Sequence, residues 1–549
     1  MRPGPPTPPP PPFPSARRAQ LAAVLAADTG LGLQQWELKM FLNEFDQSED
    51  RVTADAFTGI YTYLASRPPT PAAAAPRVSA GAPAAIPAAI PAAPDAAPTI
   101  TSFPPDYLLD PTGCVPIESV AADVAPSDDA VPSRWRSASG AGQYPKLPFL
   151  GGAGAPFSLL VKGTRAMDHL PPPVDVVRRL HVRPSADAFS PHPNDVGGVL
   201  AAFAELARKE IGAGSDSGSS RCEMSSYFDL QMLYGTSAEE CAAIRTFEGG
   251  KIKPDAAARR GGCDSAAAAA LLVVFSRNHN LVADHVASAG DGSDEDVFQT
   301  ARHVNALAFR AVYLKDYVPF AAAGQHLPEP MPTPRADPTR PAGANGSVEL
   351  DLVLRVALAM EPEPGLAPAP TEDDDVLDVD AALREASAAR CGLAARCNVP
   401  TRLGASEIAV IRASRAAGVC TLNEFRARCG LPRWTSFEEM TGGETKLCET
   451  LAELYRDVDE VELYTGMLCE YNVSNTGAML PHTAHMCALP LEALANDAWF
   501  SEEKLADEGT YTAWGIKHGK ETSLASLLAA HTGAKLVGDS PFEVGALAA

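Results

Sequence analysis

The chain has 549 residues, of which 46% are hydrophobic and 21% charged, and its formal net charge is −23. This length allows two to four domains, or one large domain with extensions. The acidic balance disfavours nucleic acid as a partner, because phosphate contacts need Lys and Arg. The longest apolar run, residues 266–275, is shorter than the roughly 18 residues that span a bilayer. We therefore expect neither a nucleic-acid partner nor a transmembrane segment.

The N-terminus and the cysteines suggest where the protein is found. The chain opens with prolines instead of an apolar signal core, so no secretory signal is predicted. The 11 cysteines form no C-x-x-C pair, and their spacing is typical of reduced thiols. Both observations favour a cytoplasmic protein.

Proline is concentrated at the front of the chain, where 26 of the 50 prolines fall within the first 150 residues. Residues 1–14 are predicted to form a polyproline II tail. This tail is either a ligand for the groove of an SH3 or WW domain, and so the contact to a protein partner, or a solvated tail. Residues 67–143 are rich in Ala and Pro and are predicted to be a disordered linker.

Residues 15–66 are similar to an EF-hand, because two helical patterns flank oxygen-bearing side chains at alternate positions. These candidate calcium ligands are Asp46, Ser48 and Asp50. A calcium loop needs about 12 residues, a Gly at its bend and a bidentate Glu at its end. Arg51 stands where the Gly is required, and the loop is one residue short. We therefore expect a degenerate EF-hand-like helix pair that does not bind calcium tightly.

The pattern becomes globular from about residue 144. Apolar residues recur at helical spacing and strand signals are few, which predicts a mainly α fold. The predicted domain spans residues 144–475, followed by a divergent C-terminal extension at 476–549. Its long helices are expected at residues 196–211, 265–288, 295–318, 348–359 and 405–420.

Five collinear sequence blocks carry a family resemblance. They begin at Leu150, Pro191, Ser226, Phe275 and Thr421 and read LGGAGAPF, PHPN, SYFDLQMLYG, FSRNHN and TLNEFR. In order and spacing they resemble the animal-type haem peroxidase superfamily, in particular its branch of fungal fatty-acid dioxygenases similar to linoleate diol synthase. Prostaglandin synthases are more distant relatives. The resemblance implies a large helical domain, a haem cofactor and the oxygenation of polyunsaturated fatty acids.

The family's proximal motif is altered in this chain. The family has Tyr-Arg-Trp-His, where the His ligates the haem iron and the Tyr three residues earlier forms a radical. The aligned residues here are Leu354, Arg355, Val356 and Ala357, so only the arginine is retained. Alanine has no lone pair for iron and leucine cannot form a phenoxyl radical. The resemblance therefore implies that the radical and haem-ligand positions are lost.

The distal side is altered as well. Counted from the PHPN block, the distal His position of the family falls on Lys209. A lysine with an ordinary pKa near about 10.4 is protonated and is a poor base at neutral pH. The adjacent Asp, a calcium ligand in related peroxidases, is Glu210 here, a weak calcium candidate. We interpret His279 and His303, which lie in predicted helices, as structural.

Three hypotheses follow. The first is a degenerate family member, a pseudoenzyme that keeps the fold and binds a fatty acid, another lipid or a protein. The second is a working haem oxygenase with an unusual iron ligand. The third is an interaction scaffold that recruits partners through the Pro-rich tail and the EF-hand-like segment.

Overall fold

The computed structural model describes residues 16–17, 51–52, 107–110, 113–116 and 134–548, with gaps at 143–146, 165–168, 212–220, 255–261, 291, 322–346, 371–376, 429–430, 471–496 and 507. The chain divides into a small unit, Met1–Ala84 with Ser474–Thr476, and a large unit formed by the rest. In the small unit, strand β1 (Ala16–Arg17) pairs with β2 (Arg51–Val52) in antiparallel fashion. The Pro-rich tail, most of the linker, the two EF-hand-like helices and the candidate ligands Asp46, Ser48 and Asp50 lie outside the described residues.

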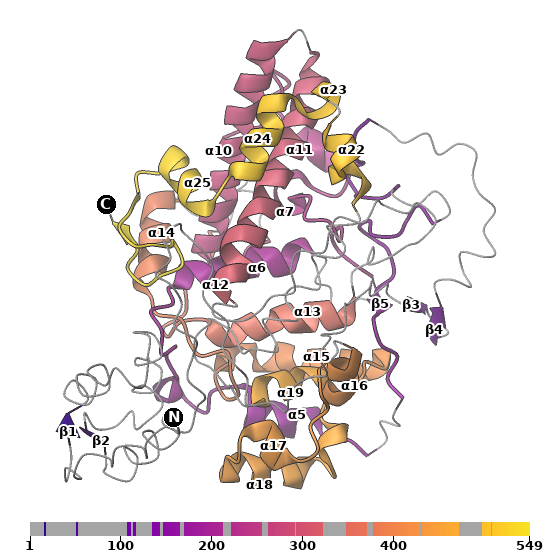
Figure 1. Ribbon diagram of the computed structural model, residues 1–549, viewed down its shortest axis with the longest axis vertical. Helices are drawn as coiled ribbons and strands as arrows, with labels where there is room; N and C mark the ends of the chain where they lie inside the picture. Colours follow the sequence, from indigo (N-terminus) through magenta and orange to yellow (C-terminus); the bar gives the residue numbers. More distant parts are fainter. Residues whose placement is uncertain are drawn as a thin grey trace, which may run out of the picture. The chain divides into compact units, whose positions relative to one another are not determined.

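The large unit is mainly helical, as predicted (Figure 1). Its α-helices are α5 (Pro173–Val176), α6 (Gly198–Glu210), α7 (Gln231–Tyr234), α8 (Ala238–Ile244), α10 (Ala266–Ala289), α11 (Asp294–Val312), α12 (Val318–Ala321), α13 (Val348–Arg355), α14 (Val379–Ala388), α15 (Gly404–Ala417), α16 (Leu422–Arg428), α17 (Phe437–Thr441), α18 (Thr445–Leu454), α19 (Leu463–Cys469), α22 (Glu502–Leu505), α23 (Glu508–Tyr511), α24 (Ala513–Glu521) and α25 (Leu524–His531).

Shorter elements complete this unit. Two π-helical turns are η1 (Val177–His181) and η4 (Tyr313–Tyr317), and the 3-10 turns are η2 (Ala186–Ala188), η5 (Val356–Met360), η6 (Thr401–Leu403), η7 (Val458–Glu460) and η8 (Ala498–Phe500). Its strands form two small antiparallel sheets, one in the order β4 (Gly113–Pro116), β3 (Tyr107–Asp110), β5 (Ser158–Leu159), and one of β6 (Lys535–Leu536) with β7 (Leu547–Ala548).

Helices α10 and α11 lie side by side as a helical hairpin (Figure 1). Polar side chains fix both starts, because the free N–H groups of a helix N-terminus need acceptors. The Ser265 hydroxyl accepts from the Ala268 N–H at the start of α10. At the start of α11, Ser293 and Asp296 form a reciprocal capping box. These caps explain why both helices begin within a residue or two of their predicted positions.

Helix α10 is the one helix in the described part of the chain with the length and composition to cross a membrane. Residues 266–275 are the first part of this helix, which continues past Asn278 and His279 to Ala289, close to its predicted end at residue 288. In its most apolar window, 83% of the residues are buried inside the protein. The first part of α10, residues 266–276, is buried on all sides, which is the form expected of a core helix.

Two predicted helices change their geometry near their C-terminal ends. The predicted helix 295–318 widens into the π turn η4 before Pro319, which has no N–H to donate to the residue four positions earlier. The predicted helix 348–359 becomes the 3-10 turn η5 after Arg355. Such tightening is common at helix C-termini. Both helices therefore exist where predicted, with a different final turn.

The C-terminal segment from residue 497 onward packs on the α10–α11 hairpin. Helix α24 lies along α11, and its glycines make the close approach possible. A Cβ at Gly515 would lie 2.8 Å from Val304 Cγ2, and a Cβ at Gly519 would lie 2.8 Å from Leu307 Cδ2. Any larger residue at either glycine would therefore push α24 away from α11.

Buried ion pairs tie the same segment to the start of the described core. The guanidinium of Arg136 pairs with Asp497, and Arg310 pairs with the other oxygen of that carboxylate. Arg136 also stacks over the rings of Tyr227 and Trp499, at 4.3 and 4.7 Å. Because all of these groups are buried, each charge depends on its partner.

Candidate functional site

Helices α6 and α13, which carry the predicted distal and proximal positions, pack against each other (Figure 1). Helix α13 starts at a cap in which the Ser347 hydroxyl accepts from the Leu350 N–H. Leu354 is on its last turn and is 1% exposed, and Ala357 follows on η5 and is 7% exposed. The fold therefore brings Leu354 and Ala357 close to the helix that carries Lys209.

A cavity of about 70 Å³ lies between these helices. Leu354, Ala357 and Leu358 line one wall, and Ala204 and Arg208 of α6 line the opposite wall. Among the residues that the structure describes, no histidine lines this cavity. The cavity therefore offers aliphatic side chains at the positions where the family has its tyrosine and its iron ligand.

Lys209 does not line the cavity. Its ammonium pairs with Asp264, at 2.9 Å from Oδ1, and also donates to the carbonyl of Gly262. The adjacent residue on α6, Arg208, does border the cavity. Its guanidinium lies 3.8 Å from the Asp351 carboxylate. The sequence singled out Lys209 and not Arg208, and the two side chains have different surroundings because consecutive residues lie about 100° apart around a helix.

Glu210 has a structural role. Its carboxylate accepts the N–H groups of Gln231 and Met232, at 2.9 and 2.7 Å, and so caps the start of α7. A carboxylate at a helix N-terminus is favourable because the free N–H groups carry partial positive charge. Within the described ranges no cluster of three His, Cys, Asp or Glu side chains could hold a metal ion.

Arg355 belongs to a buried polar chain beneath the cavity wall. Its Nε donates to Glu407 at 2.9 Å, and Glu407 in turn lies 2.8 Å from Nδ1 of His181. The Nε2 atom of His181 is 2.9 Å from the hydroxyl of Thr465. Burial alone raises the pKa of Glu407, but the His181 hydrogen bond and the Arg355 charge bring it below its ordinary value. Arg355 therefore neutralises a buried carboxylate.

The two histidines interpreted as structural are engaged elsewhere. His279 is fully buried, and its ring nitrogens contact the Tyr234 hydroxyl at 2.8 Å and the Gly250 carbonyl at 3.0 Å. His303 contacts the Arg136 N–H and the Tyr511 hydroxyl, both at 3.3 Å. Burial is the main reason why both histidines have lowered pKa values, about 4 for His279. Both rings are neutral hydrogen-bonding groups at neutral pH.

Comparisons with known proteins agree with this fold. Residues 405–542 match the family model "Animal haem peroxidase". The chain is 27% identical over 420 residues to 7,8-linoleate diol synthase of Pyricularia oryzae and 28% identical over 417 residues to linoleate diol synthase of Gaeumannomyces graminis. Each alignment covers 61% of this chain and 35% of the relative, so the chain spans about a third of the length of these relatives.

Solved structures give the same result at lower sequence identity. The fatty acid alpha-dioxygenase of Oryza sativa superposes with a TM-score of 0.64 at 16% identity, covering 80% of this chain and 90% of that one. Peroxidase A of Dictyostelium discoideum superposes with a TM-score of 0.57 at 15% identity, covering 74% and 99%. Together the comparisons confirm the predicted resemblance: the chain is related to the animal haem peroxidases and to the fungal linoleate dioxygenases.

Proposed function

We propose that this chain is a pseudoenzyme, a fatty-acid-dioxygenase-like protein that keeps the fold without the haem chemistry. The cavity between α6 and η5 carries the proposal. The cavity measures about 70 Å³, whereas a pocket for a drug-sized ligand measures roughly 300–1,000 Å³. A porphyrin is at least as large as such a ligand, so the cavity is too small for it. The residues present do not fit haem, since Leu354 and Ala357 supply no donor atom and Lys209 is held by Asp264.

The names of the relatives suggest what such a protein binds. The fungal relatives are named for linoleate and the rice structure for a fatty acid. A fatty acid or another lipid is therefore the ligand class we propose for the retained fold, bound outside the 70 Å³ cavity, which is too small for it. Binding would be without turnover, because no described side chain at the cavity can replace the missing radical or iron ligand.

The haem spectrum tests the proposal. The full chain is produced with haem supplied, and its visible absorption is recorded beside a fungal linoleate diol synthase treated in the same way. We expect no Soret band in proportion to protein, and no oxygen uptake with linoleic acid. A Soret band equivalent to one haem per chain would refute the proposal and favour a working oxygenase with an unusual ligand.

A scaffold function is the second candidate, and the β1–β2 pairing favours it. Residues 16–17 pair with residues 51–52, and both strands belong to the small unit, Met1–Ala84 with Ser474–Thr476. Such a unit can serve as an interaction module beside the Pro-rich tail. Affinity capture with the full chain and with a chain lacking residues 1–66 tests this function. Equal recovery of partners by both would exclude it.

A further inference from the structure

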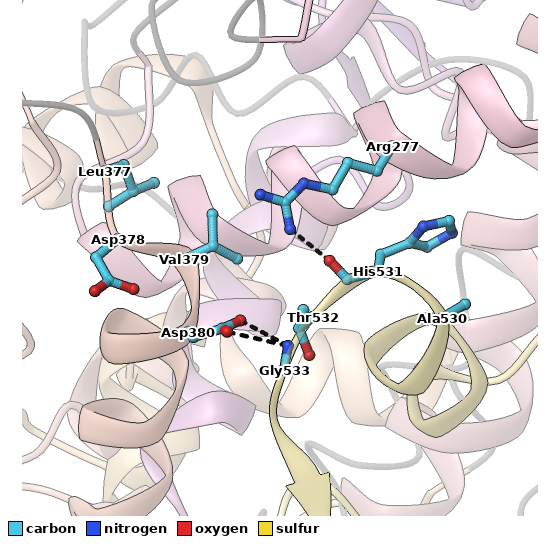
Figure 2. A pocket seen from close by; sticks show the side chains of 9 residues that line it. All are labelled: Arg277, Leu377, Asp378, Val379, Asp380, Ala530, His531, Thr532 and Gly533. Carbon is cyan, nitrogen blue, oxygen red and sulfur yellow. Dashed lines mark hydrogen bonds between the residues drawn. The ribbon is translucent and has the colours of Figure 1, made fainter. Parts of the chain in front are cut away.

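A groove of about 580 Å³ lies apart from the cavity beside Ala357 and shares none of its lining residues. We call it the Arg277 groove. Three elements line it: α10 through Arg277, the start of α14 through residues 377–380, and the end of α25 through residues 530–533 (Figure 2). Its volume lies within the roughly 300–1,000 Å³ of pockets that hold small molecules.

The groove carries separated charges of opposite sign. Arg277 is exposed, and its Nη1 donates to the carbonyl of His531, which is a neutral acceptor. No described carboxylate forms an ion pair with this guanidinium. Burial first, then the Arg277 charge, lowers the pKa of His531 to about 4, so its ring is neutral at neutral pH. Arg277 is therefore the positive charge of the groove.

The two carboxylates on the α14 side are also without a cation. Asp378 caps α14 by accepting from the Ala381 N–H at 2.9 Å, and Asp380 accepts the Gly533 N–H at 3.0 and 3.1 Å (Figure 2). Within the described part of the chain neither carboxylate has an ion-pair partner. Leu377 and Val379 also line the groove, and Val379 is buried.

We propose that the Arg277 groove binds a zwitterion with anionic oxygens at one end and a primary ammonium several bonds away, the chemistry of phosphoethanolamine. The planar guanidinium matches the oxygens of a phosphate or carboxylate, and an ammonium can donate to two carboxylates at once. In the groove, Arg277 lies too far from Asp378 and Asp380 to pair with either. A ligand whose own charged groups are several bonds apart can therefore contact both sides. This chemistry occurs both in soluble metabolites and in a lipid headgroup.

Calorimetry on the full chain tests the proposal, with O-phosphoethanolamine as the probe and ethanolamine and inorganic phosphate as its two halves. We expect the probe to bind at least about tenfold more tightly than either half, because each half loses one charge-assisted contact. Equal binding of the probe and one half, or no binding of the probe, would overturn the proposal. Vesicles with phosphatidylethanolamine, compared with phosphatidylcholine vesicles, identify the source. Vesicle binding assigns a lipid headgroup, and binding of the free probe alone assigns a soluble ligand.

Two variants remove the charges while preserving the fold. Asp378→Asn with Asp380→Asn keeps both oxygen acceptors, since asparagine is also a good helix cap, and should weaken probe binding about tenfold. Arg277→Gln should weaken it to a similar degree. Arg412→Gln, at an exposed position on α15, and Asp539→Asn, outside the groove, are the matched controls and should bind as the parent does. Unchanged binding by the folded double Asn variant would refute the site.

Discussion

The Nδ1 atom of His181 lies 2.8 Å from Oε2 of Glu407, and both side chains are fully buried although 226 residues separate them. Glu407 also accepts from Arg355, the one residue retained from the family's proximal motif. Its pairing with Glu407 therefore gives Arg355 a structural role that does not depend on haem. Under the proposal that the motif has lost its chemistry, the arginine still balances a charge in the core.

Replacing Glu407 tests this role. Glu407→Gln removes the carboxylate that pairs with the buried Arg355 guanidinium, and removal of one partner of a buried pair costs about 3–5 kcal/mol. We expect a loss of that size in the free energy of unfolding, measured by denaturant titration. Arg178→Gln is the control, because Arg178 is 73% exposed in its pair with Asp175, and surface pairs contribute about 0–1 kcal/mol. Equal effects of the two variants would contradict the role.

The cavity beside Ala357 should accept a larger side chain. Ala357→Val adds two methyl groups toward an existing void, so we expect unchanged or raised thermal stability. Ala268→Val is the matched control on α10, where the alanine is fully buried and borders none of the described cavities. There, overpacking should cost about 1–3 kcal/mol. If Ala357→Val were as destabilising as the control, the void would not be available to a side chain.

His279 predicts acid sensitivity. Its folded pKa of about 4 is below the ordinary value of 6.5, mainly because of burial, so folding favours the neutral ring. The stability that this provides is complete above pH 6.5 and is lost as the pH falls toward 4, by about 3 kcal/mol in all. Unfolding titrations at a series of pH values should show this slope. His279→Gln should reduce it, with His285→Gln as the control at an exposed position of α10.

Glu349 predicts the opposite dependence. This carboxyl is fully buried and accepts the Val161 N–H at 2.9 Å, and burial raises its pKa to about 7. Because the folded state favours the protonated form, its contribution to stability is complete below pH 4.5 and is lost as the pH rises through 7. Glu349→Gln should therefore stabilise the protein above pH 7, by up to about 3 kcal/mol at pH 9. A variant less stable than the parent at pH 9 would contradict this assignment.

The sequence predicted the long helices because their signals are local. Apolar residues at helical spacing predicted α6, α10 and α13. His181 was missed because its partners, Glu407 and Thr465, are distant in sequence and no local pattern marks a buried histidine. The Arg277 groove was missed for the same reason, since three separate segments meet there only in the folded chain. Leu354 and Ala357, which line the cavity, were selected from the sequence only through the family motif.

The burial of α10 has a consequence for synthesis on the ribosome. After the adjacent helix α11, the helix that packs most extensively on α10 is α14, which begins at Val379, 379 − 289 = 90 residues after the end of α10. At about 5–20 residues per second, α10 waits roughly 5–20 s for α14. During this interval a helix with membrane-spanning length and composition lacks one of its native partners. Chaperone capture of the nascent chain after residue 289 would therefore set the yield of folded protein.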